Sequence, residues 1–395
     1  MHKIIVEKPY HFVAPHPGRF WPRLIALLLP LYLRRWHGVV QVDFRGLEHL
    51  RASVSSGHGI LLTPNHCRPC DPMVLGLLAR AAGQPFFVMA SRHLFEQHPL
   101  QTWLLRRAGA FSVYREGLDR DALRAAVDIL RNASRPLVLF PEGVITRTND
   151  RLNPLMDGMA FIAHSAAKQR ADRGQVVIHP VAMRYLFEGN LEAALTPTVE
   201  ELERRLSWRP KHQLTLHERL AKVGVALLGL KEVEYFGEVR PGPVAERIQR
   251  LIDRLLVPLE AQWVKGQGDG DVVARVKRLR TAMVPDLANG DLSEDERVRR
   301  WAQLEEVYLA QQLSFYPPDY IEGAPAHERL LETAERFEED LTDHARVYSP
   351  IRAVVTVGPA LPVSPARERG VADPLVEQVR ASLDKLLSVP REALL

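Results

Sequence analysis

The sequence predicts an α/β domain with a central, mostly buried sheet flanked by helices, carrying a mainly helical insertion. Three observations lead to this fold class. Between residues 60 and 185, short apolar runs alternate with segments of helical spacing, as in layered α/β domains. From about residue 191 to 346 the strand signal fades and helices dominate. A strand-like run at 353–358 follows, which indicates an insertion into one domain rather than two independent domains.

The individual elements follow from these patterns. Strands are expected at 60–62, 86–89, 110–113, 137–140 and 176–178, and helices at 71–82, 99–107, 118–133 and 157–168. In the helical stretch, apolar residues from 244 to 259 follow one helix face. Ser293 and Glu296 form a capping-box pattern, and Asp373 before Pro374 predicts the start of a terminal helix. No internal repeat is evident.

Composition excludes several classes of protein. The 395 residues include 46% hydrophobic and 25% charged residues, which is ordinary for a soluble globular protein. A net charge of +4 is too small to indicate nucleic-acid binding. This mild excess of basic residues would suit an anionic membrane surface or an anionic substrate. The two cysteines are too few for a disulfide framework, so a reducing compartment is expected.

The first 36 residues contain an apolar run at 24–33 that is interrupted by Pro30. This run is shorter than the ~20 residues that cross a bilayer, and no signal-peptide cleavage site follows it. Trp21, Trp36 and nearby arginines favour a segment that lies in a membrane interface. A buried helix docked on the domain is the alternative. We expect a cytoplasmic protein held peripherally on the membrane face.

The most informative stretch is residues 61–72, Leu-Leu-Thr-Pro-Asn-His-Cys-Arg-Pro-Cys-Asp-Pro. An apolar strand ends here and a helix begins at Asp71, with Pro72 at a favoured first-turn position. His66 therefore lies in the connecting turn, at a strand end where α/β sites are usually built. A turn at Pro69 could fold the Asp71 carboxylate back onto the imidazole, where it would fix the tautomer and stabilise imidazolium. Alone, His66 could be structural and Asp71 a helix cap.

Three further stretches follow in order. Residues 109–115 form an apolar run that ends in an arginine, Phe-Pro-Glu-Gly stands at 140–143, and an apolar strand at 177–182 carries a proline. With Asn65, His66 and Asp71, these stretches resemble the four blocks of the glycerolipid acyltransferase family, which includes the bacterial 1-acylglycerol-3-phosphate acyltransferases. The first block is the His-X4-Asp (HX4D) motif, and the order and spacing of four matches are far more specific than one.

The resemblance covers about residues 35–190 and the strand and helix after 350. It implies four parts: an interfacial or docking segment at 1–36, the acyltransferase domain at 37–190, a helical insertion at 191–346, and a strand and helix at 347–395 that return to the domain. The sequence departs from the family where Val144 and Ile145 separate Gly143 from Thr146 and Arg147. The helical insertion has no counterpart that the motifs align.

The resemblance also implies the roles of the site residues. His66 would be the general base with Asp71 as its partner, and the acceptor hydroxyl would attack the thioester directly. An imidazole pKa near 6.5 suits such proton transfer at neutral pH. The residues implied to bind the acceptor and its phosphate are Arg115, Glu142, Gly143 and Arg147. Supporting positions are Asn65, Gly109, Pro141 and Pro180.

The expected function is transfer of a fatty acyl group to a hydroxyl of a glycerol-phosphate-type acceptor in phospholipid biosynthesis. The donor is acyl-CoA or acyl-carrier protein, and lysophosphatidate is the first choice of acceptor. A membrane surface is the expected partner, with no nucleic acid, no cofactor and no metal.

Two other functions use the same residues. Cys67 and Cys70 have the spacing of a thiol–disulfide exchange motif placed before a helix, and with His66 they could supply three zinc ligands. A non-catalytic lipid-binding relative of the same fold is the third reading. The intact His66–Asp71 pair favours the acyltransferase.

Overall fold

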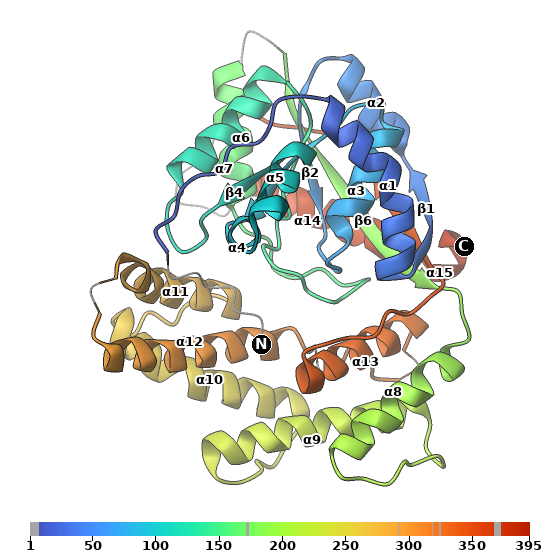
Figure 1. Cartoon of the computed structure of the whole chain (residues 1–395), viewed down its shortest axis with the longest axis vertical. Helices are drawn as coiled ribbons and strands as arrows, with labels where there is room; N and C mark the ends of the chain where they lie inside the picture. Colours follow the sequence, from blue (N-terminus) through green and yellow to red (C-terminus); the bar gives the residue numbers. More distant parts are fainter. Residues whose placement is uncertain (1–7, 171–173, 291, 318, 324, 367–372) are drawn as a thin grey trace. The chain divides into compact units, whose positions relative to one another are not determined.

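The computed structural model describes residues 8–170, 174–290, 292–317, 319–323, 325–366 and 373–395. It comprises two compact units (Figure 1). The α/β unit contains His11–Tyr114, Leu118–Gly189 and most of Val347–Leu395. The helical unit contains Asn190–Arg346, the short segment Arg115–Gly117 and residues 8–10. Among the described residues, no helix combines the length and apolar character needed to cross a bilayer.

The described part of the α/β unit is built on an eight-stranded sheet in the order β1-β7-β6-β2-β5-β3-β4, with β8 paired to β6. Neighbouring strands are parallel except that β6 runs antiparallel to β7 and β8. The carboxyl ends of β2, β5, β3 and β4 therefore meet at one edge of the sheet. The strands are β1 (Val39–Arg45), β2 (Gly59–Pro64), β3 (Phe87–Ser91), β4 (Ala110–Val113), β5 (Leu137–Val138), β6 (Val176–Phe187), β7 (Ile351–Val357) and β8 (Leu361–Pro362).

Helices of this unit cover the sheet. The core joins α6, α7 and α14 to β2, β4, β5 and β6 through buried apolar side chains such as Leu130, Ile162 and Val379. Helix α1 packs against α3 and β1. The helices are α1 (Phe20–His37), α2 (Leu47–Ser55), α3 (Asp71–Ala81), α4 (His93–Glu96), α5 (Pro99–Ala108), α6 (Arg120–Asn132), α7 (Gly158–Arg170), α14 (Pro374–Leu387) and α15 (Arg391–Leu394).

The predicted fold class, an α/β sheet flanked by helices with helical extras, is confirmed. The pattern also predicted the late strand, which is β7, and the cap of α14, where the Asp373 side chain accepts from Leu375 N. It missed β1 and α2, which precede the first run that alternates clearly. The strand expected at 137–140 is shorter, because ladder pairing stops at Val138.

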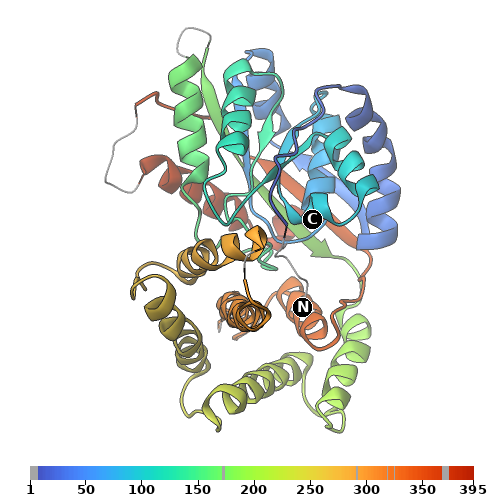
Figure 2. The same cartoon turned by 60° about the vertical axis from the view of Figure 1, so that its left-hand side comes forward.

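The described part of the helical unit consists of α8–α13, and α12 is seen end-on with other helices of the unit around it (Figure 2). A core between α10, α11 and α12 includes Leu255, Leu279 and Leu304. One half of the predicted capping box is present, since the Ser293 side chain caps α12 by accepting from Glu296 N, whereas the Glu296 carboxylate accepts from Arg299 and Arg300. The helices are α8 (Leu191–Arg205), α9 (Leu216–Phe236), α10 (Val244–Trp263), α11 (Val272–Asn289), α12 (Glu294–Ser314) and α13 (His327–Thr342).

A recurring ion pair links successive helices of this unit. A glutamate near the end of one helix binds, through two hydrogen bonds, an arginine in the first turn of the next helix, 15 or 16 residues later. The pairs are Glu203–Arg219, Glu232–Arg247 and Glu260–Arg275, and all six side chains are buried. The expectation of no internal repeat was therefore wrong, because the repeat lies in a few charged positions of otherwise divergent helices.

These pairs generate a stability prediction. Arg247→Met should lower the free energy of unfolding by about 3–5 kcal/mol, because it leaves the Glu232 carboxylate buried and uncompensated. Lys231→Met is the matched control, since the Lys231–Glu234 pair is largely exposed and should contribute less than about 1 kcal/mol. Urea unfolding followed by circular dichroism measures both. Equal losses would show that burial of the Arg247 pair has no special cost.

Candidate active site

His66 lies in the loop between β2 and α3, at the carboxyl end of β2. Its Nδ1 is 2.8 Å from Asp71 Oδ2, so the turn does fold the carboxylate back onto the imidazole. The ring stacks on Phe140, with centroids 3.9 Å apart. The His66 side chain is 14% exposed, whereas that of Asp71 is fully buried. With Nδ1 facing Asp71, Nε2 is the nitrogen turned away from the carboxylate.

Asp71 does not cap α3. Cys70 occupies the N-cap position without a side-chain bond, and Asp71 is the first helical residue. The carboxylate instead accepts hydrogen bonds at both oxygens. Oδ2 faces His66 and accepts from the backbone N–H of Arg68 at 3.0 Å, and Oδ1 accepts from the Tyr185 hydroxyl at 2.5 Å. The interpretation of Asp71 as a helix cap is therefore wrong.

The loop after β5 holds the backbone of His66 on both sides. The Glu142 carboxylate accepts from His66 N at 2.8 Å and from Asn153 N at 2.9 Å. Thr146 donates from its backbone N and its hydroxyl to the His66 carbonyl, at 2.8 and 3.1 Å. In this structure, Glu142 positions the loop that carries the imidazole. Burial raises the pKa of Glu142 to about 7, although both backbone N–H groups oppose the shift.

Two asparagine side chains continue the sheet beyond the end of β2. Pairing of β6 with β2 stops at Val181, and among the described residues no strand pairs with the next part of β6 on that side. Asn65 exchanges two hydrogen bonds with the backbone of Met183, at 2.7 and 3.1 Å. Asn149 does the same with Tyr185, at 2.6 and 3.1 Å. Both loops of the site are thereby fastened to one strand.

The other supporting positions have local backbone roles. Gly109 ends α5 with φ 103°, and a Cβ there would lie 2.5 Å from the Phe86 carbonyl oxygen, so only glycine fits. The Pro141 carbonyl accepts from Met156 N. Pro180 sits where β6 changes partner from β8, which ends its pairing at Ile178, to β7. A missing N–H is tolerated at such a break in the ladder.

The remaining residues implied to bind phosphate lie in three places. Gly143 adopts φ 72° directly after Glu142, in the same turn. Arg147 is half-buried in the neighbouring loop with φ 57°, a backbone region uncommon for residues other than glycine. Arg115 follows β4 and belongs to the helical unit, whereas the His66–Asp71 pair belongs to the α/β unit. Burial, and then the positive charge of Arg280, lower the pKa of Arg115 to about 10.

Both cysteines of the first motif are buried free thiols. Cys67 Sγ lies 3.7 Å from the Met183 carbonyl, and Cys70 Sγ lies 3.7 Å from the Tyr185 hydroxyl. Burial raises the pKa of Cys70 to about 12. Redox-active thiols have lowered pKa values and partial exposure, so this environment disfavours thiol–disulfide exchange. Within the described ranges, no group of three or more His, Cys, Asp or Glu residues is placed to hold a metal ion.

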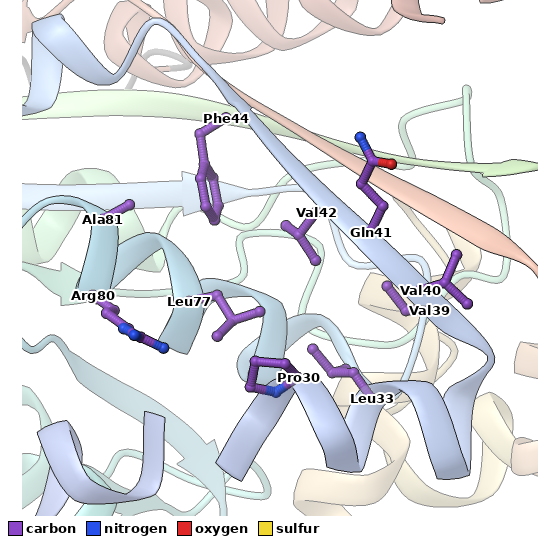
Figure 3. A pocket seen from close by; sticks show the side chains of 10 residues that line it. All are labelled: Pro30, Leu33, Val39, Val40, Gln41, Val42, Phe44, Leu77, Arg80 and Ala81. Carbon is purple, nitrogen blue, oxygen red and sulfur yellow. The ribbon is translucent and has the colours of Figure 1, made fainter. Parts of the chain in front are cut away.

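A cavity of about 430 Å³ lies between α1, β1 and α3 (Figure 3). Phe44, Val42 and Leu77 point into it, and Arg80 lies near one end. Because α3 begins at Asp71, one helix both lines this cavity and carries the buried carboxylate. The lining residues are Pro30, Leu33, Val39, Val40, Gln41, Val42, Phe44, Leu77, Arg80 and Ala81.

Comparisons with known proteins give the family that this segment resembles. Residues 41–184 match the model of the Acyltransferase family. A stretch of 107 residues is 29% identical to a 1-acyl-sn-glycerol-3-phosphate acyltransferase of Streptococcus pneumoniae, covering 27% of this chain. The match spans only 37% of that relative's length. The resemblance to the glycerolipid acyltransferase family seen in the motifs is confirmed over this segment of the chain.

The position of Glu142 generates a pH prediction. Its pKa in the folded protein, about 7, lies above the ordinary 4.5, so the folded state binds more protons than the unfolded state between these values. Its contribution to stability is therefore full below pH 4.5 and is lost as pH rises toward 7, by up to about 3 kcal/mol. The thermal unfolding temperature of the wild type should therefore fall over this pH range, relative to that of Glu142→Gln. Parallel pH profiles for the two proteins would show that Glu142 does not titrate there.

Proposed function

We propose that this protein is an O-acyltransferase that moves a fatty acyl group from a thioester donor to a hydroxyl of a glycerol-phosphate-type acceptor. The observation that carries the proposal is the His66–Asp71 contact at a strand end, inside the segment that matches the Acyltransferase family. The name of the Streptococcus pneumoniae relative supports lysophosphatidate as the first choice of acceptor. The donor is acyl-CoA or acyl-carrier protein.

The proposed reaction uses His66 as general base. Nε2 takes the proton of the acceptor hydroxyl as the oxygen attacks the thioester carbonyl, and Asp71 stabilises the imidazolium that forms. The tetrahedral intermediate then expels the thiolate, and the imidazolium returns the proton to this leaving sulfur, which gives the free thiol and neutral His66. A positioned base of this kind contributes about 10²–10⁴-fold in rate.

Assignments for substrate binding extend the proposal. The motif match supports Arg115 and Arg147 as phosphate-binding residues, since guanidinium binds phosphate oxygens in a bidentate manner. The apolar lining of the cavity beside α3 supports it as a site for part of an acyl chain, with Leu77 and Leu33 as contacts. Glu142 and Gly143 would shape the acceptor side of the site.

A membrane surface is the proposed location of the reaction. Helix α1 presents a row of exposed apolar side chains, and Trp21 packs edge-to-face against Trp103 of α5 with ring centroids 5.0 Å apart. Arg107 lies over both rings, and exposed Arg34 and Arg35 follow at the end of α1. Apolar side chains beside arginines suit an anionic bilayer interface. The exposed apolar residues of α1 and α5 are Phe20, Leu24, Leu27, Leu28, Leu31, Tyr32, Trp36, Leu100, Trp103 and Leu104.

The chemistry is tested by transfer from a labelled acyl thioester to lysophosphatidate under reducing conditions. His66→Ala should reduce activity by at least 100-fold, because the base is lost. The double variant Cys67→Ala with Cys70→Ala is the matched control in the same loop and should keep most of the activity. Circular dichroism checks that each variant is folded.

Two results would contradict this mechanism. A folded cysteine double variant without activity would require an acyl-cysteine or dithiol role. A wild-type protein that binds lysophosphatidate but transfers no acyl group from either donor would indicate a non-catalytic lipid-binding relative.

The membrane proposal predicts sedimentation with anionic vesicles and release by high salt or carbonate. Leu28→Glu with Leu31→Glu should weaken vesicle binding more than tenfold, since burying each leucine contributes about 1.5–3 kcal/mol. Val225→Glu with Leu230→Glu changes two exposed apolar side chains of α9 and serves as control. Equal loss in both variants, or release by detergent alone, would rule out peripheral docking through α1.

A further inference from the structure

We propose that Tyr185 is a positioning residue of the His66–Asp71 pair, whose hydroxyl fixes the Asp71 carboxylate and sets how strongly it stabilises a protonated imidazole. The inference deepens the proposed function and rests on it for its kinetic consequences. Tyr185 lies in β6, directly after the segment that matches the Acyltransferase family. Nothing in the sequence motifs distinguishes it from the other apolar residues of that strand.

The hydroxyl of Tyr185 is a permanent donor to Asp71. The side chain is fully buried, and its oxygen lies 2.5 Å from Asp71 Oδ1. Burial, and then the negative charge of Asp71, raise the pKa of Tyr185 well above 10. The phenol therefore keeps its proton throughout the neutral range. Because the ionised carboxylate only accepts hydrogen bonds, the proton of this contact stays on the tyrosine.

The backbone and ring of Tyr185 are held in place independently of Asp71. Asn149 exchanges two hydrogen bonds with the Tyr185 backbone, which fixes this residue of β6 beyond the end of β2. The guanidinium of Arg68 lies over the phenol ring, 5.5 Å from its centroid, and Cys70 Sγ lies 3.7 Å from the hydroxyl. The donor is therefore preorganised, and Asp71 must orient toward it.

The two oxygens of Asp71 have separate partners. Oδ2 faces the imidazole, and Oδ1 accepts from Tyr185. Removing the donor at Oδ1 frees the carboxylate to rotate and concentrates negative charge on the oxygen that faces His66. Both effects change the environment of the base without touching it.

Other charged and titratable groups surround the pair and are not themselves substituted when the Tyr185 hydroxyl is removed, although Cys70 loses its 3.7 Å contact with that hydroxyl. Arg68 lies in the same loop, Glu142 holds the backbone of His66, and Cys70 precedes Asp71. His37 at the end of α1 is close enough for Arg68 and Asp71 to affect its pKa. A change in titration after removal of the hydroxyl therefore reports on the contact with Asp71.

The test is the titration of the His66 imidazole by nuclear magnetic resonance, assigned with His66→Ala, in the full-length protein. In Tyr185→Phe the midpoint should move to higher pH by about 0.5–1 unit, because a hydrogen bond to a charged group contributes more energy than such a shift and only part of it reaches the imidazolium. Tyr320→Phe is the matched control, since it also removes a buried hydroxyl that donates to a carboxylate, that of Glu332 in the helical unit. It should leave the midpoint unchanged.

A second variant keeps the ring in place and reverses the sign. Tyr185→3-fluorotyrosine has a more acidic phenol, which donates more strongly to Asp71 and should move the His66 midpoint to lower pH. If Tyr185→Phe does not fold, this variant decides the question. In acyl transfer, Tyr185→Phe should lower kcat about tenfold with little change in the acceptor KM, and the acidic limb of the pH–rate profile should move to higher pH.

The outcomes separate this inference from the proposed function. Unchanged His66 titration in both Tyr185 variants overturns the positioning role, whether or not the protein transfers acyl groups. Shifts of opposite sign in a protein without transferase activity support the contact and reject the proposed reaction. A fall in kcat that accompanies an unshifted titration assigns Tyr185 a purely structural role.

Discussion

The Asp71 carboxylate is a charge with no exposed surface, and the arrangement around it follows from that constraint. A buried ion is tolerated only when hydrogen bonds replace the water it has lost. Here the imidazole of His66, the backbone N–H of Arg68 and the hydroxyl of Tyr185 surround it. The three groups come from a loop and a strand 114 residues away, so one carboxylate joins distant parts of the chain. The same contacts that satisfy the charge also fix the base.

The sheet provides the frame for this arrangement. Strand β6 is longer than its neighbour β2, and the backbone of its overhanging part needs partners. The amides of Asn65 and Asn149 supply them with the geometry of a ladder, although neither belongs to a strand. The loops before α3 and after β5 are thereby held at a common edge. Glu142 and Thr146 then fasten one loop to the other through the backbone of His66.

The helical unit uses charge differently. Its repeated Glu–Arg pairs are buried and bidentate, and each connects the end of one helix to the start of the next. Such pairs contribute little net stability compared with apolar contacts, but breaking one is costly, so they hold the end of each helix against the start of the next. Along the chain, Arg115 lies between β4 and α6 of the α/β unit, but it is grouped with the helical unit.

The sequence by itself determined the fold class, most strands and helices, and the approach of His66 to Asp71, because these depend on local periodicity and on a short turn. It could not determine the contact of Tyr185 with Asp71 or the amide ladder of Asn149, since a buried tyrosine in an apolar strand has the same pattern as any core residue. It also gave Asp71 the role of a cap, whereas in the fold its carboxylate contacts His66 and Arg68 of its own loop and Tyr185 of β6. Tertiary structure decided these points because a buried polar group takes the partners that packing brings within hydrogen-bond distance, and no local pattern records them.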